Sequence, residues 1–326
     1  MNVSSIPIII MIIIILLSPL VFKNIYKFEV SYKGQVEIVK SFCKANHVDY
    51  VPTPPVPSDP RYKYRPIIGG LRYEFWKPFD ETYEVWARYT CTIGIPAYYQ
   101  PCKHCPVMWG FLTAGHCLDN LEYSVYQNDS RKSDDLVGYS KLSSIYVPLD
   151  DNKYHTDSAF VVLWITNDDT TWPPANILLP RIWYSYEDIA SYVFIVGIGS
   201  NPQYIEKVYM SGQYSRTKEL IVIDYKWECL QDEEGRIWCG HFLKLWSSNQ
   251  PPDGDSGSPI YRLVSGPYAW VYGIIVGYDL DNPNIVYAGY IKEILNTLPQ
   301  ADEAWPSEAG KSLKVFICPN PYNNPC

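Results

Sequence analysis

The sequence predicts an all-β domain, a barrel or a sandwich, from its composition and its apolar patterning. Aromatic residues make up 15% of the chain, with 29 Tyr and 11 Trp, which favours β-structure over helical bundles. Short apolar segments follow one another from Ile67 onward, punctuated by glycine and proline, as expected for many short strands. At 326 residues and 47% hydrophobic content, the chain is long enough for a two-lobed domain with a sizeable core.

Residues 84–95 show the period of two that is typical of a half-buried strand. One face would carry Val85, Ala87, Tyr89, Cys91, Ile93 and Ile95, and the other Glu84, Arg88, Thr90 and Thr92. Residues 158–165 and 269–278 are nearly continuous apolar runs and predict buried strands, and residues 220–227 predict another. Only residues 288–298 have helical spacing, with Ile291, Ile294, Leu295 and Leu298 on one face.

The first 22 residues predict a signal peptide or a membrane anchor in the form of a hydrophobic helix. Ile6 to Phe22 is almost continuously apolar and lies at the short end of the roughly 17–25 residues that span a bilayer. Lys23 follows the run directly, so the positive-inside rule would place it in the cytoplasm, against export of the rest. Residues 23–66 would be a juxtamembrane or pro-segment, and its proline-dense part, Val51 to Pro60, favours an extended linker.

Charge and cysteine content indicate which partners and compartment to expect. The net charge is about −8, from 27 basic and 35 acidic side chains, so nothing suggests a nucleic-acid partner. Nine cysteines favour an oxidising compartment. We therefore expect an extracellular or cell-surface protein, secreted or anchored through residues 6–22 if that segment is not cleaved.

A catalytic site is predicted from a serine motif near residue 256 and from an upstream histidine in Thr113-Ala114-Gly115-His116-Cys117. Asp253-Gly254-Asp255-Ser256-Gly257-Ser258-Pro259 is a turn by composition, but its serine is also a candidate nucleophile. A serine hydroxyl needs a base and a group that orients the base. His116 and Asp157, which begins a buried strand, are the candidates, and the order His, Asp, Ser is one of the known chain orders for this triad.

These residues bring the sequence close to a known family. It resembles the chymotrypsin-fold, trypsin-like serine proteases, and within them the bacterial secreted branch typified by alpha-lytic protease and the streptogrisins. The resemblance covers roughly Ile67 to Ile317. It rests on four motifs in the family's order: Ile67-Ile68-Gly69-Gly70, Gly110-Phe111-Leu112-Thr113-Ala114-Gly115-His116-Cys117, Asp157-Ser158-Ala159 and Gly254-Asp255-Ser256-Gly257.

The resemblance implies two six-stranded antiparallel β-barrels and a C-terminal helix. Residues 67–180 would form the first barrel, which carries His116 and Asp157, and residues 181–317 the second, which carries Ser256. The backbone N–H groups of Gly254 and Ser256 would form the oxyanion hole, without a metal or other cofactor. Asp255 would be buried beneath the loop and would need a cationic partner; Arg181 or another cation could serve.

The resemblance also locates a specificity pocket, and there the chain departs from its relatives. Val276 stands where relatives often carry a serine that supports the triad acid, and Tyr278 where many keep a glycine; Gly277 lies between them. Gln250 and its neighbours lack the acid of a trypsin and the bracing cysteine, which argues against a preference for Lys or Arg.

Four disulfides follow from the resemblance and from proximity in the sequence. They are Cys91–Cys117, Cys102–Cys105, Cys229–Cys239 and Cys318–Cys326, the last locking a tail of residues 318–326, and Cys43 is left over. A zinc site made of Cys91, Cys102, Cys105 and Cys117 is the alternative, since Cys-x-x-Cys is a common metal half-site.

We therefore expect a serine endopeptidase that acts on polypeptides. The alternative is a protease-fold protein without turnover that serves as a binding or surface-structural module, which Val276, Tyr278 and the missing brace would suit.

Overall fold

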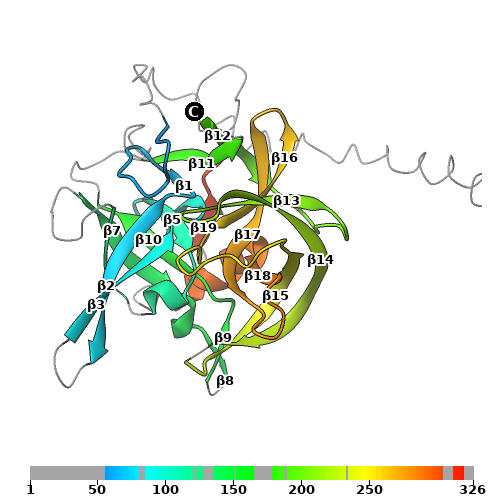
Figure 1. The fold of residues 1–326 in the computed structure, drawn as a ribbon. Coiled ribbons are helices and arrows are strands. Elements are labelled where there is room, and N and C mark those ends of the chain that lie inside the picture. Colours follow the sequence, from blue (N-terminus) through cyan, green and yellow to red (C-terminus); the bar gives the residue numbers. More distant parts are fainter. Residues whose placement is uncertain are drawn as a thin grey trace, which may run out of the picture. The chain divides into compact units, whose positions relative to one another are not determined.

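In the computed structural model, β-strands pair into two large sheets. The structure describes residues 56–80, 85–119, 121, 123–127, 135–150, 152–164, 178–186, 189–232, 234–303 and 311–318. All of them belong to one unit of the chain, which comprises residues 50–326. The all-β prediction is confirmed for this part of the chain, whose single α-helix lies near its C-terminal end (Figure 1). The predicted segment 1–22, the proline-rich residues 51–55 and Cys43 lie outside the described residues.

The first sheet closes into a ring of antiparallel strands, in which β3 (Val85–Thr92) and β4 (Pro96–Gln100) together take the place of one strand, so that seven labelled elements make a six-stranded ring. The other elements are β2 (Arg72–Asp80), β5 (Met108–Thr113), β6 (Ser124–Tyr126), β7 (Leu136–Ser143) and β10 (Ala159–Leu163). Around the ring, β2 pairs with β3, β4 with β5, β5 with β10, β10 with β7, β7 with β6 and β6 with β2. Strands β3 and β4 act as one bent strand, because Gly94 N–H donates to the Leu112 carbonyl and Leu112 N–H to that of Ile95, both at 2.9 Å.

The second sheet contains another closed ring of six strands. They are β13 (Lys207–Gly212), β14 (Arg216–Gln231), β15 (Ile237–Trp246), β16 (Pro259–Ser265), β17 (Tyr268–Tyr278) and β18 (Ile285–Tyr290). The order around the ring is β13, β14, β15, β18, β17 and β16, and β16 pairs back onto β13 (Figure 1). Both rings agree with the double barrel that the resemblance implies.

The remaining described strands lie outside the two rings, and some of them link the two halves of the chain. They are β1 (Ile67–Gly69), β8 (Pro148–Asp150), β9 (Lys153–His155), β11 (Leu178–Tyr186), β12 (Ile189–Ile198) and β19 (Ser312–Val315). β9 comes from the first half but pairs in parallel with β15 of the second, and β19 comes from the second half but pairs with β4 of the first. β12 attaches β11 and β1 to β17.

Apolar side chains fill each ring and continue between them. Tyr73, Phe75 and Phe111 are at most 1% exposed inside the first ring. A second cluster joins Leu112 and Phe160 of the first ring to Ile274 of the second. Strand β10 is buried along its whole length, which explains why its sequence is continuously apolar rather than alternating. The site described below therefore stands on a rigid, close-packed base.

Two local predictions are wrong. The helix α3 runs from Ile291 to Thr297, not from Ala288, because Ala288 to Tyr290 form the end of β18, which has a paired strand on either side. Thr92 is fully buried instead of lying on a polar face. The remaining short helices are 3-10 turns: η1 (His116–Leu118), η3 (Ser144–Tyr146) and η4 (Leu298–Ala301). None of the described helices is long and apolar enough to cross a bilayer.

The Cys91–Cys117 disulfide closes a segment with a sequence separation of 26, and the Cys102–Cys105 disulfide one of 3. Because the longer loop restricts the unfolded chain more, replacing both members of the first pair by serine should lower the free energy of unfolding by about 3–4 kcal/mol. The double serine variant of the second pair is the control, and should cost about half as much. Urea unfolding of both variants measures this, and equal losses would contradict the loop-length argument.

Candidate active site

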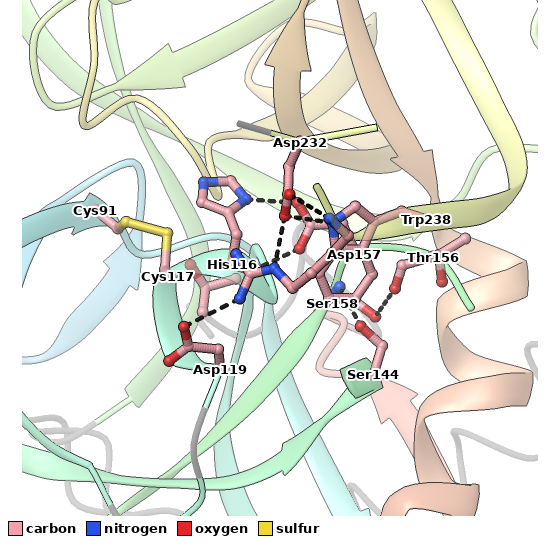
Figure 2. A network of polar contacts seen from close by, with 12 residues as sticks. Cys91, His116, Cys117, Asp119, Ser144, Thr156, Asp157, Ser158, Asp232 and Trp238 are labelled. Carbon is pink, nitrogen blue, oxygen red and sulfur yellow. Dashed lines mark hydrogen bonds and ion pairs between the residues drawn. A yellow bond between two sulfur atoms is a disulfide. The ribbon is translucent and has the colours of Figure 1, made fainter. Parts of the chain in front are cut away.

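His116 lies in the turn η1, directly after the buried strand β5. The disulfide to Cys117 ties this turn to Cys91 on β3, with 6.5 Å between the two Cα atoms (Figure 2). Gly115 precedes the histidine at a point without room for a side chain, since a Cβ there would lie 2.8 Å from Asp157 Oδ1 and 2.7 Å from Ser158 N. The chain can therefore pass close enough to Asp157 for direct hydrogen bonding.

Asp157 holds His116 through two hydrogen bonds. Its Oδ1 accepts the backbone N–H of His116 at 2.6 Å, and its Oδ2 lies 2.5 Å from Nδ1 of the imidazole (Figure 2). Because an ionised carboxylate can only accept, Nδ1 carries the proton and Nε2 is left as an acceptor. The Asp157 side chain is 4% exposed and that of His116 28% exposed, so solvent or a substrate can reach the imidazole but not its partner.

The loop that carries Asp157 is fixed by its neighbours. Ser158 N–H donates to Ser144 Oγ at 2.9 Å, and Ser158 Oγ donates to the Thr156 carbonyl at 3.0 Å (Figure 2). Ser144 begins η3, which leads into the β8–β9 hairpin. The backbone beside Asp157 is thus tied in place by Ser158, which fixes the position from which the carboxylate reaches His116.

The charges around His116 together raise the pKa of its imidazole. Burial by itself would lower the pKa of His116, but the Asp157 charge and its hydrogen bond outweigh burial and raise that pKa above its ordinary value. Lys77 and Arg236 act in the opposite direction to Asp157. Such a shift is useful in a base that must hold a proton transiently.

Ser256 lies in a tight turn between β15 and β16 and is half-buried. Asp255 N–H donates to the Pro252 carbonyl at 3.2 Å, and Ser258 N–H to that of Asp255 at 3.0 Å. Gly254 and Gly257 have φ of +93° and +89°, values that glycine adopts without strain. The sequence Gly-Asp-Ser-Gly therefore suits this turn.

The Ser256 turn packs against the strand ends that lead to His116. Thr92 N–H donates to the Ser256 carbonyl at 2.9 Å. A Cβ on Gly257 would approach the Thr92 carbonyl and Ala114 N, so only glycine fits there. The structure thus brings the segments that carry His116 and Ser256 together, although no hydrogen bond joins Ser256 Oγ to the imidazole among the described residues. In ligand-free enzymes that bond is often long and tightens with substrate.

Three backbone N–H groups of the turn, those of Asp253, Gly254 and Ser256, have no acceptor among the described residues. Asp255, Gly257 and Ser258 each donate to a backbone carbonyl. Gly254 and Ser256, the two residues predicted for an oxyanion hole, have no such bond within the described segments. A pair of free N–H groups beside a serine can stabilise a developing oxyanion.

The Gly254 carbonyl is held from the opposite side by two side chains. Thr92 Oγ1 donates to it at 3.0 Å and Gln213 Nε2 at 2.5 Å, and Gln213 N–H in turn donates to Thr92 Oγ1 at 3.3 Å. Gln213 is 1% exposed. Gln213 could not be identified from the sequence, because it lies in an ordinary polar turn and only the tertiary packing brings it to Gly254.

Asp255 is buried as predicted, at 1% exposed, and Lys218 rather than Arg181 is the cation whose charge acts on it. Its carboxylate accepts the backbone N–H groups of Tyr214 at 2.9 Å and Ser215 at 3.0 Å, in the turn between β13 and β14. Burial raises the pKa of Asp255, and hydrogen bonds from the Ser215 side chain and from both backbone N–H groups oppose the rise, as does the charge of Lys218. Arg181 lies elsewhere, with its guanidinium 4.1 Å from the ring centre of Tyr192. Two converging N–H dipoles, together with the charge of Lys218, thus stabilise the buried carboxylate.

The predicted pocket residues fall on two separate segments. Gln250 is exposed in the loop between β15 and β16, and the neighbouring Asn249 carbonyl accepts a hydrogen bond from Lys218 Nζ. Val276, Gly277 and Tyr278 end β17, and Val276 packs against a cluster that contains Trp238 and Phe242. At Gly277 the space where a Cβ would lie is open.

The cysteines of the alternative zinc site are all engaged in disulfides. Cys91 bonds to Cys117, and Cys102 to Cys105 at the tip of the β4–β5 hairpin. That alternative is therefore wrong, and within the described residues no group of His, Cys, Asp and Glu is suited to a metal ion. Cys229 bonds to Cys239 across β14 and β15. Cys318 is disulfide-bonded too, and its predicted partner Cys326 lies outside the described residues.

The fold is similar to that of chymotrypsin-type bacterial serine proteases. Solved structures that it resembles include Thermobifida fusca protease A, with 18% identity over 77% of this chain and 99% of the other and a TM-score of 0.48. A Nocardiopsis protease has 18% identity over the same shares and a TM-score of 0.47. A Cellulomonas bogoriensis chymotrypsin has 17% identity, again over 77% and 99%, and a TM-score of 0.47. The sequence matches no protein-family model and no curated protein.

Asp157→Asn should lower the pKa of His116 below its ordinary value of about 6.5, because burial, Lys77 and Arg236 would then act without the opposing charge. A folded-state pKa that is raised stabilises the fold fully below the unfolded pKa, and this stabilisation is lost as the pH rises through the folded pKa. In the variant the sign of this dependence should reverse, because a folded-state pKa below the unfolded one makes the fold less stable as the pH falls below the unfolded pKa. Histidine NMR titration measures the pKa, with Asp150→Asn, at an exposed carboxylate, as control; an unchanged His116 pKa in Asp157→Asn would refute the pairing.

Proposed function

We propose that the chain is a serine endopeptidase, exported or membrane-tethered, that hydrolyses peptide bonds with Ser256, His116 and Asp157. The observation that carries the proposal is the His116–Asp157 pair, with its 2.5 Å contact at Nδ1. That contact leaves Nε2 as the acceptor a serine hydroxyl requires. The packing of the Ser256 turn on the same strand ends supports the proposal further.

In this mechanism each group has one task. Ser256 Oγ attacks the scissile carbonyl while His116 Nε2 takes its proton, and the resulting imidazolium is stabilised by Asp157. The N–H groups of Gly254 and Ser256 bind the oxyanion. His116 then gives the proton to the departing amine, which leaves an acyl-enzyme, and a water activated by the same imidazole releases the acid. No step requires a group from outside the chain other than water and substrate.

The substrate class that we propose is a polypeptide, with specificity set by Gln250, Val276, Gly277 and Tyr278. None of these residues is acidic, so a cationic side chain would have no carboxylate among them to pair with. The proposed pocket therefore favours an uncharged side chain over Lys or Arg. Export is supported by the disulfides, which persist in oxidising compartments.

One observation favours the second candidate, a protease-fold binding module without turnover. Val276 packs into an apolar cluster and has no polar atom to offer Asp157. In relatives a serine at the position of Val276 often supports the triad acid. If that support is essential, Asp157 would lack it in this chain and catalysis would fail. Activity measurements separate the two candidates, because a binding module would hydrolyse nothing.

Ser256→Ala and His116→Ala should each reduce peptide hydrolysis at least about 10⁴-fold, and the double variant should be no worse, because the triad acts as a unit. A fluorogenic peptide library measures this. Ser265→Ala, at an exposed serine on β16, and His104→Ala, at the exposed tip of the β4–β5 hairpin, are matched controls and should stay active. Losses that add in the double variant would contradict a triad, and an inactive wild-type protein would favour the binding module.

A further inference from the structure

The hairpin between β14 and β15 carries residues of the second ring to the His116 turn. Its two strands are joined by the Cys229–Cys239 disulfide. Its tip is closed by Asp232 N–H, which donates to the Arg236 carbonyl at 3.0 Å. The β8–β9 hairpin braces it, since Asn152 Nδ2 donates to the Gly235 carbonyl at 2.9 Å. The tip of the hairpin is therefore fixed in place by hydrogen bonds on both sides.

Arg236, at this tip, contacts carboxylates from both halves of the chain. Nε lies 2.7 Å from Asp232 Oδ2 and Nη2 2.9 Å from Glu234 Oε2, both on its own hairpin. Nη1 lies 3.1 Å from Asp119 Oδ2, which belongs to the end of the His116 turn. The Arg236 side chain is 12% exposed, so its charge is largely removed from water and depends on these partners (Figure 2 shows Asp119 and Asp232).

Lys77 continues the chain of contacts to His116 itself. Its Nζ lies 2.9 Å from the same Asp119 Oδ2 and donates to the His116 carbonyl at 2.7 Å. Asp119 is thus shared by a lysine of β2 and an arginine of the second ring. One unbroken series of polar contacts runs from the hairpin tip through Asp119 and Lys77 to the backbone of the proposed catalytic base.

We propose that Arg236 is a positioning residue for His116, which ties the His116 turn to the second ring and so to the side of the site that carries Ser256. The proposal rests on the proposed function, because it concerns the same site. An ion network of this burial contributes little net stability, since the desolvation of its charges offsets their attraction. Its main effect is to hold geometry, and geometry matters here because misplacing a reacting group by 1 Å can cost roughly 100-fold in rate.

Charge supports the same assignment. The groups that face the His116 turn are Asp157 from the loop before β10, Lys77 from β2, Asp119 from the turn itself, and Arg236 with Asp232 and Glu234 from the hairpin. Arg236 and Lys77 both lower the pKa of His116, against Asp157. Arg236 therefore limits how strongly Asp157 can hold the imidazolium, which must give up its proton in each cycle.

The test replaces Arg236 by Gln and by Lys in the full chain. In Arg236→Gln the NMR-determined pKa of His116 should rise by several tenths of a pH unit, and the acid limb of the pH profile of kcat/KM should move up with it. The value of kcat should fall about tenfold, with little change in KM, because the reacting groups are less well aligned. Arg236→Lys keeps the charge and should restore the pKa and part of kcat.

Lys226→Met is the matched control, because it removes a cation from the same hairpin but from outside this network. Asp119→Asn breaks the link from the other side and should lower kcat as Arg236→Gln does. If Arg236→Gln behaves like the control in both the His116 pKa and kcat, Arg236 has no positioning role. If the wild-type protein hydrolyses no peptide, the proposed function fails, and the NMR titration still decides whether Arg236 acts on His116.

Discussion

Thr92 joins the two segments on which the proposed chemistry depends. Its N–H donates to the Ser256 carbonyl, its hydroxyl to the Gly254 carbonyl, and its own carbonyl accepts Thr113 Oγ1 at 3.0 Å from the strand that leads to His116. One residue at the end of β3 thus fixes the nucleophile turn and the histidine strand against each other. Since Thr92 is fully buried, each of these bonds is expensive to leave unmade, and this restricts the site to one arrangement.

Charged groups act differently on the two segments that Thr92 connects, the Ser256 turn and the His116 turn. Asp255, beneath the Ser256 turn, accepts backbone N–H groups directly and also lies in the field of the Lys218 charge. His116, in contrast, lies among an acid and two cations, and its protonation follows from their balance. The Ser256 turn is therefore held mainly by backbone dipoles, whereas the protonation of His116 depends on the balance of three charged neighbours.

The sequence predicted much of this arrangement for physical reasons. Alternating and continuous apolar runs indicated the strands. Gly115, Gly254 and Gly257 lie where no side chain fits or where φ is positive, so the two motifs that contain them could be recognised from the sequence around them. Gln213, Lys77 and Arg236 could not be found in this way, because each acts through a partner at least 39 positions away in the chain. Thr92 was misplaced for the same reason: alternation assigned it to the solvent face, and the packing of a second ring on that face buried it.

The proposed activity depends on Ser256 as a nucleophile that His116 activates. Reaction of the intact protein with a fluorophosphonate, followed by digestion and mass spectrometry, tests this most directly. We expect a single adduct on Ser256, which forms much more slowly in His116→Ala and is absent in Ser256→Ala. An adduct on another residue, or no adduct on the folded wild-type protein, would contradict the account.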